Sequence, residues 1–251
     1  MPPRVLHPNT RALIARLRGS LPEPEAPPPP PAVAAPAPFK LTPYQPKPYK
    51  SAAPKAPSPQ AAFAFAAAPD ASDVIVLDTE TTGIGAFARI VEVAALHVKN
   101  GVVVRQFQSL VDPEMHIPSM VVRVHGITDA MVAGAPTAAP VLASFAKFVA
   151  GHTLVAHNAS FDFGVLSREY ARVKLPTPGC GMYCSVKLAR VVFPEAPNHK
   201  LGTLATFLKL THPPAHRALA DCFTTMELLN AMAARKKSHQ AVRLVGRRYA
   251  L

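Results

Sequence analysis

An apolar strand that runs directly into two acidic residues is the feature that most limits how this chain can fold. The stretch VIVLDTETTG, residues 74–83, places four apolar residues immediately before Asp78 and Glu80. A continuous apolar run of this kind is typical of a strand that is covered on both faces. Side chains two residues apart on a strand point to the same side, so the two carboxylates would project together from its carboxyl end. The stretch predicts an α/β fold with a polar site at one edge of the sheet.

The two carboxylates also limit the chemistry of that edge. Neighbouring carboxylates repel each other, so one of them keeps a proton unless a cation lies between them. Ligands that are all oxygen atoms suit a hard cation such as Mg²⁺ or Mn²⁺. The alternative is an acidic pair that only caps a turn at the end of the strand, and this stretch alone leaves both interpretations open.

Two further motifs carry acidic residues at defined places. HNASFDFGVL, residues 157–166, follows a short predicted strand and puts Asp162 in the first turn of the next helix. The helix dipole favours an acid there, so a capping role is the alternative. HRALADC, residues 216–222, puts Asp221 beside the apolar stripe of a helix, where an acid is costly unless it is paired or binds a metal. His216, near the start of that helix, suits proton transfer at neutral pH, although a single histidine is more often structural.

Together the three motifs supply four carboxylates and one histidine. Four carboxylates can hold two divalent ions about 3.5–4 Å apart, the arrangement used for in-line displacement at phosphorus. His216 would then take a proton from the attacking water. The combination of motifs indicates metal-dependent hydrolysis of a phosphodiester bond.

The motifs DTETTG, HNASFD and HRALAD resemble those of the DEDDh 3′–5′ exonuclease superfamily, and most closely those of the proofreading epsilon subunits of bacterial DNA polymerase III. The stretch VHGITDAMV, residues 124–132, fits the same branch, and the resemblance covers roughly residues 72–234. It implies a ribonuclease H-like fold, in which helices flank a mixed five-stranded sheet whose second strand is antiparallel. It also implies hydrolysis at the 3′ ends of single-stranded DNA, in proofreading or repair, with release of nucleoside 5′-monophosphates.

The resemblance also implies a role for each site residue. The ligands of two divalent ions, Mg²⁺ or Mn²⁺, would be Asp78, Glu80, Asp162 and Asp221. The catalytic general base would be His216. The substrate-binding residues would be Thr79, Thr81, Thr82, His125, His157 and Asn158.

Two alternatives to a DNA exonuclease remain open at this point. The motifs do not separate DNA from RNA, because the 2′-hydroxyl group is read by details of the binding pocket. A 3′–5′ exoribonuclease that acts in RNA trimming or turnover is therefore one alternative. The alternative of another class is an inactive nucleic-acid-binding or scaffold protein on an exonuclease fold, which the complete set of five site residues argues against.

The distribution of charge divides the chain into four segments. We expect a short basic N-terminal helix over 1–20, a disordered linker rich in Pro and Ala over 21–70, the exonuclease domain over 71–234 and a basic tail over 235–251. The formal net charge is +12 for the whole chain, yet the domain holds 13 Lys and Arg against 12 Asp and Glu. The basic flanks would add salt-sensitive affinity for a nucleic-acid backbone, or would dock the domain on a polymerase or repair complex. The alternative is that they only improve solubility.

Hydrophobic periodicity places the elements inside the domain. Strands are expected at 73–80, 89–98, 102–111 and 153–157, with the second and third forming a hairpin across the turn KNG. Helices are expected at 119–124, 128–132, 137–150, from Ser160 onward, and at 186–192, 201–209 and 218–234. No apolar run is long enough for a membrane span, and three cysteines fit a reducing compartment, so we expect a cytoplasmic location.

Overall fold

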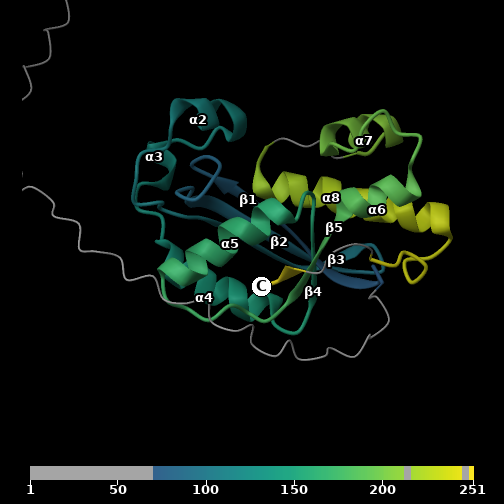
Figure 1. Cartoon of the computed structure of the whole chain (residues 1–251), viewed down its shortest axis with the longest axis horizontal. Coiled ribbons are helices and arrows are strands. Elements are labelled where there is room, and N and C mark those ends of the chain that lie inside the picture. The colour runs from purple at the N-terminus through teal and green to yellow at the C-terminus, as the bar shows by residue number, and fades with distance from the viewer. Residues whose placement is uncertain (1–69, 212–215, 245–248) are drawn as a thin grey trace, which may run out of the picture. The chain divides into compact units, whose positions relative to one another are not determined.

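The computed structural model describes residues 70–211, 216–244 and 249–251 (Figure 1). The strands are β1 (Asp73–Thr81), β2 (Ile90–Lys99), β3 (Val102–Leu110), β4 (Thr153–Ala156), β5 (Gly181–Cys184) and β6 (Tyr249–Ala250). The helices are α2 (Ser119–His125), α3 (Asp129–Val132), α4 (Ala138–Val149), α5 (Ser160–Arg172), α6 (Ser185–Val192), α7 (Leu201–Leu208) and α8 (Ala218–Lys236). The predicted N-terminal helix and all of the predicted linker except Asp70 lie outside the described residues.

The strand that carries the two carboxylates lies in the middle of the sheet. The strand order is β3-β2-β1-β4-β5-β6. β1 pairs antiparallel with β2 and parallel with β4, and β2 continues antiparallel into β3. The mixed five-stranded sheet with an antiparallel second strand is thus confirmed. The two-residue β6, which pairs antiparallel with β5, adds a sixth strand that was not predicted.

The residues of β1 alternate between two hydrophobic cores. Val74 and Val76 pack into a core that α6, α7 and α8 cover, whereas Ile75 and Leu77 pack into a core that α4 and α5 cover. The two groups of helices lie on either side of the sheet in Figure 1. A strand that is buried on both faces needs no polar alternation, which explains the apolar run in the sequence.

The turn between β2 and β3 depends on Gly101. Asn100 and Gly101 have φ values of 46° and 82°, the left-handed pair that closes a tight hairpin. The carbonyl oxygen of Gly101 accepts a hydrogen bond from Nδ2 of Asn230 at 3.0 Å, so the turn docks on α8. A Cβ atom at this position would lie 2.7 Å from Nε2 of His239 and would also clash with Asn230.

We therefore expect Gly101→Ala to lower the free energy of unfolding by about 2–3 kcal/mol, since backbone strain and overpacking add. Urea denaturation would measure the loss. Gly151→Ala is the matched control, because Gly151 has a φ of 78° but no atom lies within 4 Å of the place that its added Cβ atom would take. The control isolates the conformational cost, about 1 kcal/mol. Equal losses in the two variants would show that the clash of the added Cβ atom with Asn230 and His239 does not contribute to the loss.

The described residues after α8 return to the domain. Val242, Leu244 and Leu251 are buried, and the first two belong to the core under α8. The carbonyl oxygen of Val242 accepts a hydrogen bond from the backbone N–H of Ala71 at 3.1 Å. The segment expected as a basic tail thus contributes apolar side chains to both cores. Among the described residues, no helix combines the length and the apolar character that crossing a membrane requires.

Candidate active site

Three carboxylates from two elements meet at the carboxyl end of β1. Asp78 and Glu80 lie on the same face of the strand, as predicted, and Asp221 lies in the first turn of α8. One carboxylate oxygen from each of the three residues lies within 4.8 Å of the other two. Asp221 is buried, and the two strand residues are half-buried. The fold therefore brings together acidic groups that are about 140 residues apart in the sequence.

Asp162 joins this cluster from α5. It lies in the first turn of the helix and is 2% exposed. Its Oδ1 accepts a hydrogen bond of 2.8 Å from the hydroxyl of Thr79, which lies between the two acidic residues of β1. The Thr79 side chain thus fixes the orientation of the Asp162 carboxylate.

The acidic groups hold their protons tightly. Burial raises the pKa of Asp78 well above its ordinary value, and the charges of Asp162 and Glu80 raise it further. Burial, followed by the charge of Asp221, raises the pKa of Glu80 to about 8. Burial raises the pKa of Asp162 to about 7, although the hydrogen bond from Thr79 opposes the shift. Such crowded carboxylates fit a site for divalent cations, because bound cations would remove the repulsion.

A second group with potential metal ligands provides a contrast. Asp73, His97 and His152 also place one ligand atom each within 4.8 Å of one another, near the amino end of β1. Here Nε2 of His97 lies 2.7 Å from Asp73, and Lys99 pairs with the same carboxylate at 3.3 Å. Nε of Arg105 donates a hydrogen bond to Nδ1 of His97 at 3.3 Å. Lys99 pairs with Asp73, and Arg105 bonds to His97, so this group already has cationic partners. It does not need a metal ion to relieve repulsion between carboxylates, as the first cluster does.

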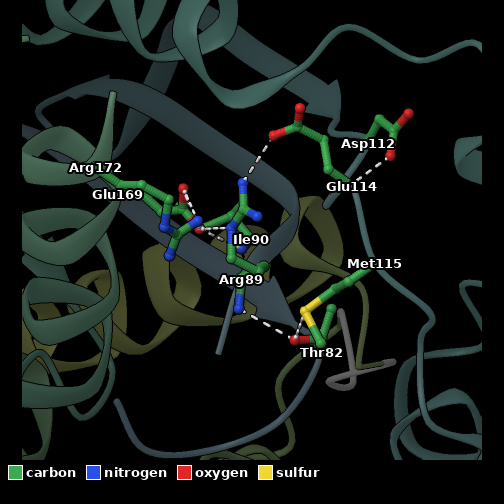
Figure 2. Close-up of polar contacts among 8 residues, drawn as sticks. All are labelled: Thr82, Arg89, Ile90, Asp112, Glu114, Met115, Glu169 and Arg172. Carbon is green, nitrogen blue, oxygen red and sulfur yellow. Dashed lines mark hydrogen bonds and ion pairs between the residues drawn. The ribbon is translucent and has the colours of Figure 1, made fainter. Parts of the chain in front are cut away.

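The loop between β1 and β2 is anchored to the helix that carries Asp162 (Figure 2). The backbone N–H of Arg89 donates to the hydroxyl of Thr82 at 3.1 Å, and its Nε donates to Oε1 of Glu169 at 3.0 Å. Glu169 is fully buried in α5 and also accepts hydrogen bonds from the backbone N–H of Ile90 and from Arg172. This network fixes the end of β1 relative to α5, and it was not predicted from the sequence.

The predicted substrate-binding threonines all have partners within the protein. Thr79 donates to Asp162, and the hydroxyl of Thr81 donates to the carbonyl oxygen of Gly83 at 2.6 Å. The hydroxyl of Thr82 accepts the hydrogen bond from Arg89. In this structure the three side chains make hydrogen bonds that hold the end of β1 and the residues after it in place. Their contact with substrate stays a prediction.

The two predicted histidines near the substrate also bond within the protein. His125 is buried, its Nε2 lies 3.2 Å from the carbonyl oxygen of Thr81, and its Nδ1 accepts from the backbone N–H of Ile127. The ring nitrogens of His157 lie 2.9 Å from Oγ of Ser185 and 3.0 Å from the carbonyl oxygen of His199. Burial lowers the pKa of His157 to about 4, so its ring is neutral at physiological pH.

Asn158 and His216 are the exposed members of the predicted site. Both have left-handed backbone conformations, with φ values of 71° and 49°. Asn158 accepts a hydrogen bond from Ser160 at the start of α5. His216 precedes Arg217, the residue before α8, and lies five residues before Asp221. The roles of Asn158 in substrate binding and of His216 as general base stay predictions.

Glu92 and Arg217 were not predicted as part of the site. Glu92 lies in β2 directly opposite Glu80 and is 0% exposed, and its carboxylate binds the guanidinium of Arg217. The one signal in the sequence is that Glu92 interrupts the apolar strand RIVEVAALHV. A buried strand contains an acidic residue only where that residue has a partner, and the partner is 125 residues away.

Comparison with known proteins agrees with this geometry. The profile of the RNase_T exonuclease family matches residues 75–229. The chain belongs to this family. Exonuclease X, whose structure was solved in complex with 5′ overhanging duplex DNA, is similar to 67% of this chain and 98% of its own, with 32% identity and a TM-score of 0.53. Exonuclease I of E. coli, solved in complex with a dA16 oligonucleotide, shares the fold over 66% of this chain and 42% of its own, with 20% identity and a TM-score of 0.59.

The exonuclease domain also matches part of much longer proteins. DNA polymerase III PolC-type of Bacillus cereus is 36% identical over 159 residues, which make up 63% of this chain and 11% of that protein. The same protein of Oceanobacillus iheyensis is 38% identical over 156 residues, again 11% of its length. The chain thus spans about a tenth of the length of these relatives.

Proposed function

We propose that the exonuclease domain is a DEDDh-type 3′–5′ exonuclease that hydrolyses phosphodiester bonds at the 3′ ends of single-stranded DNA and releases nucleoside 5′-monophosphates. The observation that carries this proposal is the cluster of Asp78, Glu80 and Asp221 at the end of β1. Asp162 lies close enough for its charge to raise the pKa of Asp78, and His216 lies near the start of α8. The raised pKa values of Asp78, Glu80 and Asp162 support it, because a cationic partner would relieve the crowding of these groups.

Each residue of the cluster has a role in this proposal. Asp78, Glu80, Asp162 and Asp221 would hold two divalent ions, Mg²⁺ or Mn²⁺. Such ions supply activation of water and neutralisation of charge on the phosphate. Thr79 fixes the orientation of the Asp162 carboxylate through its hydrogen bond. His216 takes the proton from the attacking water, and its exposed position lets the proton pass on to solvent.

The names of the relatives support DNA as the substrate. Exonuclease X and exonuclease I have been solved with DNA, and the PolC-type relatives are DNA polymerases. In the PolC-type relatives the matched stretch belongs to the same chain as a DNA polymerase. We therefore extend the proposal to a polymerase or repair complex as the partner of this chain. The segment at 1–70, or the charged side chains of the segment at 235–251, would provide the docking contacts.

A time course on single strands labelled at either end tests the proposal. DNA and RNA strands would be incubated with Mg²⁺, with Mn²⁺ and with EDTA, beside an Asp78→Ala control. We expect stepwise shortening of DNA from the 3′ end that needs the metal and is at least about a thousandfold slower in the control, since a metal ligand is lost. Preferred shortening of RNA would indicate the exoribonuclease. No shortening of any strand would leave a binding or scaffold protein on an exonuclease fold.

A further inference from the structure

Glu92 is a buried residue whose two carboxylate oxygens both accept hydrogen bonds from neighbouring groups. Its side chain is 0% exposed, and β1 places Glu80 directly opposite it. Oε1 accepts hydrogen bonds from Nε2 of Gln108 at 2.9 Å and from Nη2 of Arg217 at 2.8 Å. Oε2 accepts from Nε of Arg217 and from the backbone N–H of Ala218, both at 3.0 Å. These four bonds fill the acceptor positions of a carboxylate.

Two glutamates that face each other across two strands therefore behave in opposite ways. Burial raises the pKa of Glu92, but the hydrogen bonds from Arg217, Gln108 and Ala218 outweigh it and lower the pKa overall. Burial and neighbouring charges raise the pKa of Glu80 to about 8. Four hydrogen bonds engage both carboxylate oxygens of Glu92, so it is not available as a further metal ligand. We therefore look for the function of Glu92 in the groups that it binds, Arg217 and Ala218.

The carboxylate of Glu92 holds the beginning of α8. Arg217 is the residue before the helix, and its own side chain makes no capping bond. Ala218 is the first helical residue, and its N–H would lack a partner without Glu92. Within five residues of this contact lie His216 on one side and Asp221 on the other. One carboxylate thus fixes the segment that contains both groups to the strand next to Asp78 and Glu80.

We infer that Glu92 and Arg217 form a positioning pair, which sets where Asp221 and His216 lie relative to the carboxylates of β1. The inference rests on the proposed function, because that function gives the two positioned groups their roles. The two-point contact with the planar guanidinium determines direction as well as distance. The pair acts through Asp221 and His216 and does not itself touch the reacting atoms.

Charge-conserving variants test positioning separately from charge. The double variant Glu92→Gln/Arg217→Gln keeps the net charge and removes the ionic contact, and Arg217→Lys keeps the charge but loses the planar fork. For the double variant we expect kcat on single-stranded DNA to fall roughly 10–100-fold and the Mn²⁺ dissociation constant, measured by calorimetry, to rise roughly tenfold. Arg217→Lys should show smaller changes in the same direction. KM should change less than about twofold in both, because the pair acts on the chemical step through Asp221 and His216.

The control is Leu229→Ala, a cavity in the buried middle of α8. It should lower the melting temperature at least as much as the double variant, and leave both kcat and the Mn²⁺ dissociation constant within about twofold of wild type. A double variant that keeps wild-type kcat and Mn²⁺ affinity, or that loses no more than the control does, would overturn the inference and leave the proposed function intact. A wild-type protein that shortens no strand would overturn the proposed function, while calorimetry would still decide whether the pair positions Asp221.

Discussion

Replacing Glu80 with glutamine is expected to raise the melting temperature of the metal-free protein at pH 8 and to abolish hydrolysis. Burial, and then the charges of Asp221, Glu92 and Asp162, raise the pKa of Glu80 to about 8 in the folded protein. In the unfolded chain the pKa of a glutamate is about 4.3. The folded protein therefore holds a proton that the unfolded chain has lost, and its stability falls as the pH rises from about 4.5 to about 8. Glutamine carries no charge, so the stability of the variant does not fall in this way. The difference in stability between variant and wild type therefore grows from about pH 4.5 to about pH 8 and then levels off.

The full pKa shift would correspond to about 5 kcal/mol at pH 8. Because Glu80 is only half-buried, solvent screening lowers the expected gain to about 2 kcal/mol, or roughly 4–8 °C for a chain of this size. Thermal melts in EDTA at pH 6, 7 and 8 would measure it. Saturating Mg²⁺ should make the melting temperature of the wild-type protein the higher of the two, because the wild-type protein binds the ion more tightly and gains more stability from it. Loss of hydrolysis together with a gain in stability is the trade-off expected where an active site holds strained charges.

Glu195→Gln is the control with the opposite sign. Glu195 is exposed, and the hydrogen bond from Arg235 lowers its pKa. A lowered pKa contributes stability above about pH 4.5, so this variant should be slightly less stable than wild type and should show no gain toward pH 8. A Glu80→Gln protein that melts at or below the wild-type temperature at pH 8 would show that the carboxylates are not strained. The argument for a cation site would then fail.

The elements of the fold followed from local patterns. The ends of β1, of the hairpin and of most helices lie within one or two residues of the positions predicted from apolar periodicity, because those signals lie within a few neighbouring residues. β5, which spans four residues at Gly181–Cys184, was not placed. Its sequence, GMYC, contains no β-branched residue, unlike TLVA in the equally short β4. Its pairing with β4 depends on a segment about 28 residues earlier.

The contacts within the site did not follow from the sequence. Asp78, Glu80 and Asp221 were identified because each stands where an acid is unusual, at the end of an apolar strand or beside the apolar stripe of a helix. Asp162 stands in the first turn of a helix, where an acid is common, and was identified from its motif. The bonds from Thr79 to Asp162 and from Arg217 to Glu92 join residues 83 and 125 positions apart. No local rule links such residues. Substrate-binding roles rested on resemblance alone, and it did not reveal that His125 and His157 direct their ring nitrogens toward groups of the protein itself.

Replacing His216 with asparagine is expected to lower kcat about 10²–10⁴-fold, the usual range for loss of a general base. Asparagine is the appropriate substitution because His216 has a φ of 49°, a conformation that asparagine tolerates better than alanine. The side chain is exposed, so the melting temperature should not change. The Mn²⁺ dissociation constant should also stay within about twofold of wild type, because the four carboxylates remain. Single-turnover shortening of 3′-labelled DNA and calorimetry would measure the two quantities.

His216→Gly adds a test that separates loss of a base from damage to the site. Glycine adopts a φ of 49° without strain, and removing an exposed ring leaves space that a small solute can reach. Added imidazole should therefore restore part of the rate in the glycine variant, in proportion to its concentration, and should do nothing for Asp221→Asn. The difference is expected because imidazole can accept a proton but cannot replace a carboxylate that binds a cation. A wild-type rate in either His216 variant would mean that the attacking water loses its proton to another group, and the general base would have to be sought elsewhere on the rim of the cluster.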